Sequence, residues 1–366
     1  MERLRIIVVG GGRLGQFHAS KLAARADVHL VGIVEPSAER RKELAQEGFP
    51  VFADLSEMPG QVQAAVVAAP TTLHGRIVRA LLADGIDVLV EKPIASSVAE
   101  ARRMVVQAKT AGRILQVGHI ERFNPAFAAA KQCVASPWLI ETVRCGPFTG
   151  RSLDIGVVLD LMIHDLDLIL SLTNSFPTTV TASGRTLLGG EEDVAEARIE
   201  FDNGCTATLQ ASRITRPPRR EMRIWSNGAV ARVDFAAAEV TITRIHPDIQ
   251  AGQFRAADLS PAELRRIQPQ FHEVYLPEEA IACEKRDALA AEIADFVECV
   301  RTRRRPVVDG AAGLAALQIA EAITQAIATG EVIRPTHTPV ITPIGLGGRP
   351  TTAASSDGSD SNAAAA

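Results

Sequence analysis

The types and spacing of three residues, Lys92, Asp160 and His164, suit them to proton-transfer chemistry. Lys92 lies in the segment Glu91-Lys92-Pro93, which ends a short apolar run. Proline cannot continue a central strand, so this lysine is expected at a strand end. There its charge can lower the pKa of a substrate hydroxyl. The alternative is a solvated surface lysine.

Asp160 and His164 lie four residues apart in the stretch Ile155–Leu172, whose apolar residues recur at helical spacing. They therefore project from one side of a helix. An imidazole suits proton transfer near neutral pH, and the carboxylate can orient it or hold a substrate hydroxyl. The alternatives are a solvated polar stripe or two metal ligands. We expect no metal site, because the pattern offers no third ligand. No Gly-x-Ser-x-Gly segment supports a serine hydrolase.

The segment Gly10-Gly11-Gly12-Arg13-Leu14-Gly15 satisfies the dinucleotide pattern G-x-G-x-x-G. Gly10 allows the tight turn, Gly12 the approach of a pyrophosphate, and Gly15 close packing of helix on strand. The helix N-terminus then offers free N–H groups to the anion. We expect Gly10, Gly12, Arg13, Leu14 and Gly15 to bind a dinucleotide. The alternative is an ordinary glycine-rich turn.

Glu35 follows the second apolar run, about 20 residues after Gly15. A carboxylate at this position accepts hydrogen bonds from the adenosine ribose and repels a 2′-phosphate. The pattern favours NAD over NADP. Arg40 and Arg41 follow one helical turn later and could weaken that preference.

Alternating strands and helices are predicted to position these residues. Such alternation indicates an α/β Rossmann domain, a doubly wound parallel sheet that binds ligands at the carboxyl ends of its strands. The expected strands are Leu4–Val9, Val28–Val34, Ala64–Ala69, Ile86–Val90 and Ile114–Val117, and the helices are Leu14–Arg25, Ala38–Gln46, Leu73–Ala83 and Val98–Ala111.

The pattern changes after Pro125 to a run of strands between residues 178 and 243, followed by helices at Cys283–Thr302 and Ala311–Ala328. This order predicts an α+β domain with a large open mixed or antiparallel sheet. We expect a dinucleotide-binding domain at 1–122, a second, α+β domain at 123–335, and a disordered tail at 351–366.

Composition excludes several classes of protein. The 366 residues carry a net charge of −4 and only 4% aromatics, which argues against nucleic-acid and membrane-surface partners. No uninterrupted apolar run reaches the roughly 18 residues of a membrane span. Five scattered cysteines are expected as reduced thiols. We expect a cytoplasmic protein.

In these motifs the sequence resembles the Gfo/Idh/MocA oxidoreductases. The resemblance rests on the glycine loop, Pro70-Thr71-Thr72-Leu73-His74, Glu91-Lys92-Pro93 and Asp160-x-x-x-His164. It implies a Rossmann domain, a C-terminal sheet that often forms an oligomer interface, and chemistry at a secondary carbinol of a carbohydrate or polyol. It also implies that Lys92 and His164 are the catalytic pair and that Asp160 orients the substrate or the histidine.

Within the family, the segments Gly118–Pro125 and Val157–Asp165 look most like UDP-N-acetylglucosamine 3-dehydrogenases. This implies NAD-dependent oxidation at C3 of a UDP-N-acetylhexosamine, giving a 3-keto sugar nucleotide for 3-amino sugars and lipid A precursors. The alternatives are a free polyol or sugar dehydrogenase, such as one for inositol, and a non-catalytic NAD-binding sensor.

The resemblance suggests further contacts. Next to the cofactor we expect Pro70, Thr71, His74, Glu91 and Lys92. Arginine suits phosphate, so Arg122 and Arg151 are candidates for the substrate diphosphate, with Asn124, Asp160 and His164 nearby. Alternatively, the arginines form ion pairs, His74 begins a helix and Asn124 shapes a linker turn.

Overall fold

The first β-branched runs of the chain form a six-stranded parallel sheet in the order β3-β2-β1-β4-β5-β6. The structure is a computed structural model, which describes residues 2–150, 155–284 and 286–336. Arg151 and the tail at 351–366 lie outside the described residues. This strand order is that of the dinucleotide-binding α/β fold and confirms the predicted Rossmann sheet. The strands are β1 (Leu4–Val9), β2 (Val28–Val34), β3 (Val51–Phe52), β4 (Ala64–Val67), β5 (Asp87–Glu91) and β6 (Leu115–Gly118).

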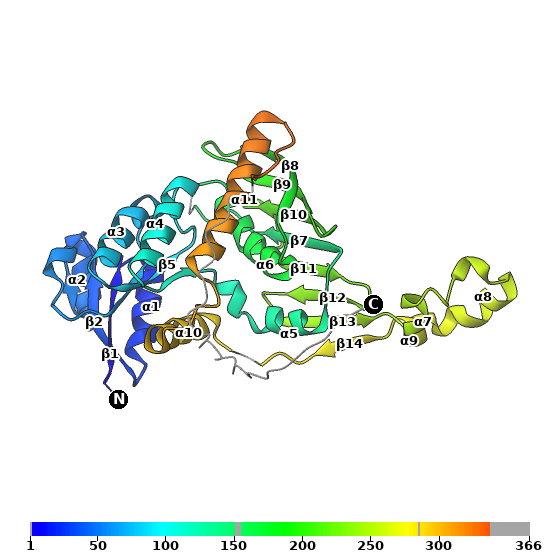
Figure 1. The fold of residues 1–366 in the computed structure, drawn as a ribbon, viewed down its shortest axis with the longest axis horizontal. Helices are drawn as coiled ribbons and strands as arrows, with labels where there is room; N and C mark the ends of the chain where they lie inside the picture. The colour runs from blue at the N-terminus through cyan, green and yellow to red at the C-terminus, as the bar shows by residue number, and fades with distance from the viewer. Residues whose placement is uncertain (1, 151–154, 285, 337–366) are drawn as a thin grey trace, which may run out of the picture. The chain divides into compact units, whose positions relative to one another are not determined.

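Helices alternate with these strands (Figure 1). They are α1 (Arg13–Ala23), α2 (Ala38–Gln46), α3 (Thr71–Ala83) and α4 (Val98–Thr110). Ser37 and Ser97 cap α2 and α4, each accepting a hydrogen bond from a backbone N–H of the first turn. The carboxyl ends of β1, β4 and β5 therefore lead directly into the glycine loop, α3 and the Lys92 segment.

The second sheet has eight strands in the order β14-β13-β12-β11-β7-β10-β9-β8. Only the β7–β10 pair is parallel, so the sheet is mixed, as predicted. The strands are β7 (Leu139–Cys145), β8 (Pro177–Arg185), β9 (Val194–Phe201), β10 (Thr206–Ser212), β11 (Arg219–Trp225), β12 (Ala229–Asp234), β13 (Glu239–Arg244) and β14 (Glu278–Ile281).

One face of the second sheet is buried against helices. Side chains alternate between buried and exposed along β9, as expected for a sheet with one covered face. The covering elements include α5 (Pro125–Cys133), α6 (Ile163–Thr173) and the π-helical turn η3 (Val158–Met162) that precedes α6. The predicted helix at Ile155–Leu172 is thus two segments, and Asp160 lies in the π-helical one.

Two late helices pack with the first sheet, and the second of them, α11, also packs with the second sheet (Figure 1). In α10 (Ala288–Thr302), Ile293 and Phe296 join the buried core of the first sheet. In α11 (Gly310–Thr329), residues contact α4 and β6 on one side and α6 and β8 on the other. The boundary at 122/123 stays a prediction, but the sequence beyond it supplies part of the first core.

Among the described residues, one helix, α11, has the length and composition of a membrane span although its apolar run is interrupted. It is 20 residues long with a mean hydropathy of 1.3 in its most apolar window, so it meets both criteria of length and composition. Half of that window is buried inside the protein. Gln318, Glu321 and Gln325 interrupt the apolar sequence of the helix, and its buried residues pack with elements of both sheets.

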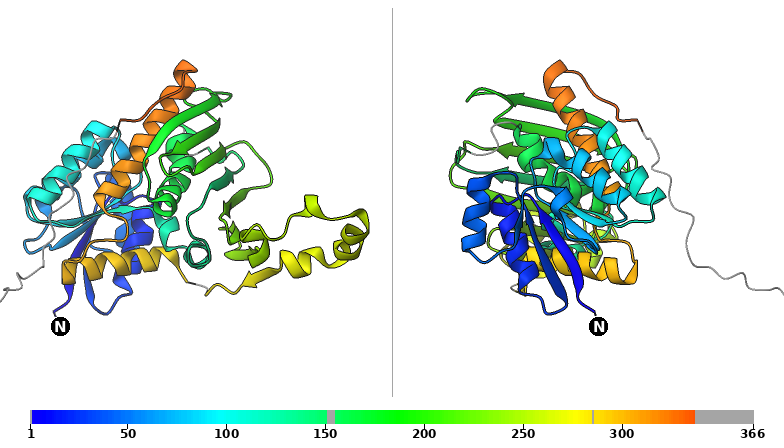
Figure 2. Two further views of the ribbon diagram at one scale, coloured as in Figure 1. Left: turned by 45° about the vertical axis from the view of Figure 1, so that its right-hand side comes forward. Right: turned by 90° about the vertical axis from the view of Figure 1, so that its left-hand side faces the viewer.

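An extension between β13 and β14 was not predicted. It contains α7 (Pro247–Gln250), α8 (Pro261–Ile267) and α9 (Phe271–Tyr275), none of which has a buried residue. Its aromatic rings cluster with one another, with Phe254 and Tyr275 4.4 Å apart between ring centroids. Figure 2 shows the extension leaving the edge of the second sheet.

Candidate active site

Lys92 and Asp160 meet although they lie 68 positions apart. The Lys92 Nζ donates to the Asp160 backbone carbonyl at 2.7 Å and to its Oδ1 at 3.2 Å. Lys92 follows β5 at the carboxyl edge of the first sheet, and Asp160 lies in the π-helical turn. Such turns are frequent at functional sites. The side chains keep 17% and 27% exposure, so the pair is sheltered but reachable.

His164 lies one turn after Asp160, at the start of α6. Its Nδ1 is buried and has no hydrogen-bond partner among the described residues, while the residue as a whole is partly exposed. Burial, and then the positive charge of Lys92, hold the pKa of His164 well below its usual value. The ring is therefore neutral at pH 7 and can accept a proton.

His119 is a neighbour of His164 that the sequence reasoning did not select. The two rings meet edge to face with centroids 6.5 Å apart. His119 is 1% exposed, and within the described part of the chain neither ring nitrogen has a hydrogen-bond partner. Burial lowers its pKa. The signal was available, because His119 directly follows β6, whose carboxyl end shares the sheet edge with Lys92.

The glycine loop has the geometry that a dinucleotide needs. Gly10 has φ +103°, and an added Cβ would lie 2.6 Å from the Ala68 carbonyl oxygen. At Gly15 a Cβ would lie 1.8 Å from the Gly10 carbonyl oxygen, so only glycine allows α1 this close to β1. At Gly12 a Cβ would meet no described atom within 4 Å, which leaves the loop open on that side. These residues fit a bound pyrophosphate.

Glu35 faces the same loop from the end of β2. Its two carboxylate oxygens accept hydrogen bonds from the backbone N–H groups of Gly11 at 2.8 Å and Ser37 at 2.9 Å. Arg40 donates to the Gly11 carbonyl at 2.7 Å and Arg41 to the Glu35 carbonyl at 2.8 Å. Arg40 thus supports the glycine loop and Arg41 the segment after β2, in addition to any effect on cofactor choice.

His74 contacts both of the segments that follow β4 and β5, where cofactor-binding residues are expected. Pro70 caps α3 and Thr71 begins it. The His74 ring is buried and lies with Nδ1 2.9 Å from the Pro93 carbonyl oxygen and Nε2 2.9 Å from the Ala69 carbonyl oxygen. His74 therefore ties the loop after β4 to the loop that carries Lys92.

Other predicted residues are engaged within the protein. Arg122 forms an ion pair with Asp167 at 3.0 Å, the alternative considered from the sequence. The Asn124 side chain caps α5 and donates to Glu121 at 3.0 Å. Glu91 is buried against His18. Direct contacts of these residues with substrate or cofactor stay predictions, as does that of Arg151.

A buried ion cluster supports the helix that carries His164. Arg144 on β7 donates to both Asp165 oxygens, at 2.9 and 2.7 Å, and to Glu121 at 2.8 Å. Burial raises the pKa of Asp165, and Arg144 opposes that rise. The sequence reasoning missed this cluster, because β7 itself was not predicted.

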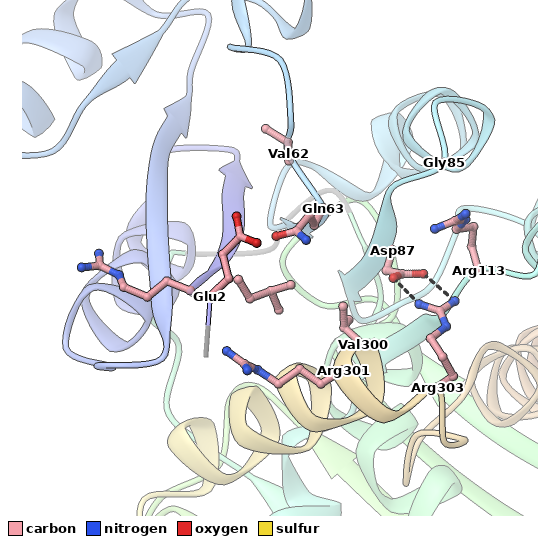
Figure 3. Close-up of a pocket in the computed structure, with 11 residues that line it drawn as sticks. Glu2, Val62, Gln63, Gly85, Asp87, Arg113, Val300, Arg301 and Arg303 are labelled. Atoms are coloured by element: carbon pink, nitrogen blue, oxygen red, sulfur yellow. Dashed lines mark hydrogen bonds and ion pairs between the residues drawn. The ribbon is translucent and has the colours of Figure 1, made fainter.

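A cavity of about 400 Å³ opens at the opposite, amino edge of the first sheet. Arg303 pairs with Asp87 there, and Arg113 and Arg301 also line it (Figure 3). Of the predicted site residues that the structure describes, none lines this cavity. Ligands of open α/β sheets bind at the carboxyl edge, so the site lies with Lys92.

Comparison with known families agrees with this geometry. Residues 4–119 match the family model described as "Oxidoreductase family, NAD-binding Rossmann fold". Residues 100–232 match "GFO/IDH/MocA C-terminal domain".

Individual relatives cover almost the whole chain. A UDP-N-acetylglucosamine 3-dehydrogenase of Acidithiobacillus ferrooxidans is 36% identical over 88% of this chain and 98% of its own length. The NAD(+)-dependent scyllo-inositol 2-dehydrogenase of Bacillus subtilis is 28% identical over 90% and 95%. A solved structure of the Acidithiobacillus enzyme superposes with a TM-score of 0.78 over 89% of this chain and 98% of that one, at 34% identity. The chain therefore belongs to the Gfo/Idh/MocA family of NAD-binding oxidoreductases, whose dehydrogenases act on CH–OH groups.

Proposed function

We propose that this protein oxidises the C3 hydroxyl of a UDP-N-acetylhexosamine with NAD, giving a 3-keto sugar nucleotide for 3-amino sugar and lipid A precursor synthesis. The contact of Lys92 with Asp160, beside a neutral His164, carries the proposal. A protein that only senses NAD needs no such acid–base group. The 36% identity to a dehydrogenase of this substrate supports the choice of sugar nucleotide.

In this proposal His164 is the general base. Because the ring is neutral at pH 7, it can take the proton of the substrate hydroxyl. Lys92 stabilises the negative charge that develops on that oxygen, and Asp160 fixes the lysine. When bound, NAD supplies the acceptor for the hydride lost by the carbinol carbon.

The cofactor is held by the first domain in this proposal. The loop residues Gly10, Gly12 and Gly15, with Arg13 and Leu14 at the start of α1, hold the pyrophosphate, and Glu35 holds the ribose. Glu35 also disfavours the 2′-phosphate of NADP. Arg122 and Arg151 are offered for the substrate diphosphate.

An absorbance screen of NAD reduction tests the proposal. The panel is UDP-N-acetylglucosamine, its C4 epimer UDP-N-acetylgalactosamine, free N-acetylglucosamine and scyllo- and myo-inositol. Turnover of a UDP-sugar but of no free sugar is expected, and its product should carry a C3 carbonyl by NMR. Reduction of NAD by none of them, with NAD bound, contradicts it.

The second candidate is an inositol-type polyol dehydrogenase. It is favoured by the relative that acts on scyllo-inositol and matches 90% of this chain. Faster turnover of an inositol than of either UDP-sugar in the same screen would select it.

We also propose a cytoplasmic homo-oligomer that associates through the open face of the second sheet. Along β9 this face exposes Glu196, Arg198 and Glu200. Sedimentation of the wild type and of an Arg198→Glu variant tests it. An unchanged monomer in both samples contradicts it.

A further inference from the structure

A second cluster of titratable side chains lies next to the backbone of Lys92 and has no part in the mechanism above. It consists of His18 on α1, Glu91 at the end of β5 and Glu292 on α10. A ring nitrogen of His18 and one carboxylate oxygen of each glutamate all lie within 4.8 Å of one another. The three residues are 0%, 8% and 0% exposed. The cluster thus joins the helix of the glycine loop, the strand of Lys92 and a helix from the last third of the chain.

Both carboxylate oxygens of Glu91 have hydrogen-bond partners in or next to this cluster. Its Oε1 lies 2.6 Å from the His18 Nε2, and its Oε2 accepts the backbone N–H of Lys92 at 3.3 Å. The backbone N–H of Lys92 is therefore hydrogen-bonded to a buried carboxylate.

The hydrogen-bonding capacity of the Glu292 carboxyl group is not satisfied. Neither of its oxygens has a hydrogen-bond donor among the described residues, although both are buried. Burial, and then the negative charges of Glu91 and Asp295, raise the pKa of Glu292. An unpaired buried carboxylate costs far more free energy than a neutral carboxyl. Two anions in this space need either a proton or a cation.

We propose that His18, Glu91 and Glu292 form a buried proton site, in which Glu292 is a neutral carboxylic acid and Glu91 remains the carboxylate. The proton on Glu292 removes the repulsion between the two groups. Glu91 can then accept from both His18 and the Lys92 backbone. Glu292 is in this sense a positioning residue, which acts on Lys92 through Glu91. The proton site stands by itself, and only its effect on turnover rests on the proposed function.

Infrared difference spectroscopy detects the proton directly. The full-length protein, labelled with ¹³C at glutamate carboxyls, is compared at pH 7 with the Glu292→Gln variant. We expect an isotope-shifted C=O band of a protonated carboxyl in the wild type and its loss in the variant. Glu298 lies exposed on the same helix, so Glu298→Gln is the matched control and should keep the band.

Rescue by the conservative variant tests the positioning role. Glutamine resembles the neutral acid, so Glu292→Gln should keep the wild-type Tm and NAD affinity, with turnover within about threefold. Glu292→Ala should lower the Tm by several degrees, because it leaves a buried cavity. The spectrum and the Tm need no substrate, so a failure of the sugar-nucleotide assignment leaves these readouts intact.

Three results would overturn the proton site. The first is a wild-type spectrum without the protonated band. The second is a Glu292→Gln variant as unstable as Glu292→Ala. The third is one equivalent of a metal ion, found by mass spectrometry in the purified wild type and absent from Glu292→Gln, which would assign the cluster to a cation.

Discussion

A histidine that stays neutral at pH 7 is suited to receive a proton. His164 owes this state to burial and to the nearby ammonium of Lys92. The same ammonium is held by Asp160, so this carboxylate positions the charge that helps to keep His164 neutral. Loss of either group should affect chemistry more than binding.

Replacement of His164 by alanine should therefore lower turnover by about 10²–10⁴-fold, the usual contribution of a general base. NAD affinity, measured by fluorescence titration, should stay unchanged, because the glycine loop is untouched. Lys92→Ala should show a comparable loss of turnover. His272, exposed on α9, provides the control His272→Ala. Near-normal turnover of His164→Ala would show that His164 is not the general base.

At the residue scale, Glu35 is expected to set the cofactor preference. Replacement by serine should erode the preference for NAD over NADP by about 1–3 kcal/mol, since a charge-assisted hydrogen bond is lost. Titration of both cofactors against wild type, Glu35→Ser and the exposed control Glu39→Ser measures this. A wild type that binds NAD and NADP equally would refute the assignment.

At the scale of elements, two glycines of one loop serve different purposes. Gly15 has no room for a Cβ, whereas Gly12 has ample room in the protein itself. Gly15→Ala should lower the Tm, because α1 must move away from β1. Gly12→Ala should keep the Tm but weaken NAD binding, because its methyl group points into the open side of the loop. Unchanged NAD affinity of Gly12→Ala would show that the cofactor does not approach there.

Most elements could be predicted from the sequence. The ranges Leu4–Val9, Val28–Val34 and Ala38–Gln46 are confirmed to the residue. Buried strands produce apolar runs and half-buried strands produce alternation, and both patterns are local. The site residues Lys92 and Asp160 were found because their motifs mark a strand end and a helix face.

Features without a local signal were missed. Strand β3 has only two residues. The π-helical turn depends on how η3 fits between the sheets, and its apolar spacing resembles that of an α-helix. Arg144, Asp165 and Glu121 converge from three elements, so only the tertiary structure brings them together. Glu292 looked like an ordinary helical glutamate.

At the scale of the whole molecule, buried neutral histidines link stability to pH. Burial lowers the pKa of His119 and His164 below that of the unfolded chain, which is about 6.5. Below that pH the unfolded chain binds protons that the folded protein does not, so these groups reduce stability as the pH falls. Glu292, whose pKa is raised, acts in the opposite direction, so a single variant must isolate the effect.

His119→Gln removes one of these groups. Its Tm should fall less steeply than that of the wild type between pH 6.5 and 5, as measured by calorimetry. The exposed control His272→Gln should follow the wild type. Parallel curves for His119→Gln and the wild type would mean that His119 is protonated in the folded protein.

The place of α10 in the first core bears on how the chain folds as it is synthesised. Leu289, Ile293 and Phe296 complete the hydrophobic core of a sheet whose first strand begins at Leu4. The ribosome therefore synthesises all six strands before it synthesises α10. Until α10 has emerged, the apolar face of the sheet that α10 covers stays exposed to solvent. A fragment ending at residue 122 should accordingly bind the dye ANS and melt without a cooperative transition. Addition of residues 286–336 as a separate polypeptide should restore the transition, and a sharp melt of the fragment alone would show that the sheet can fold without α10.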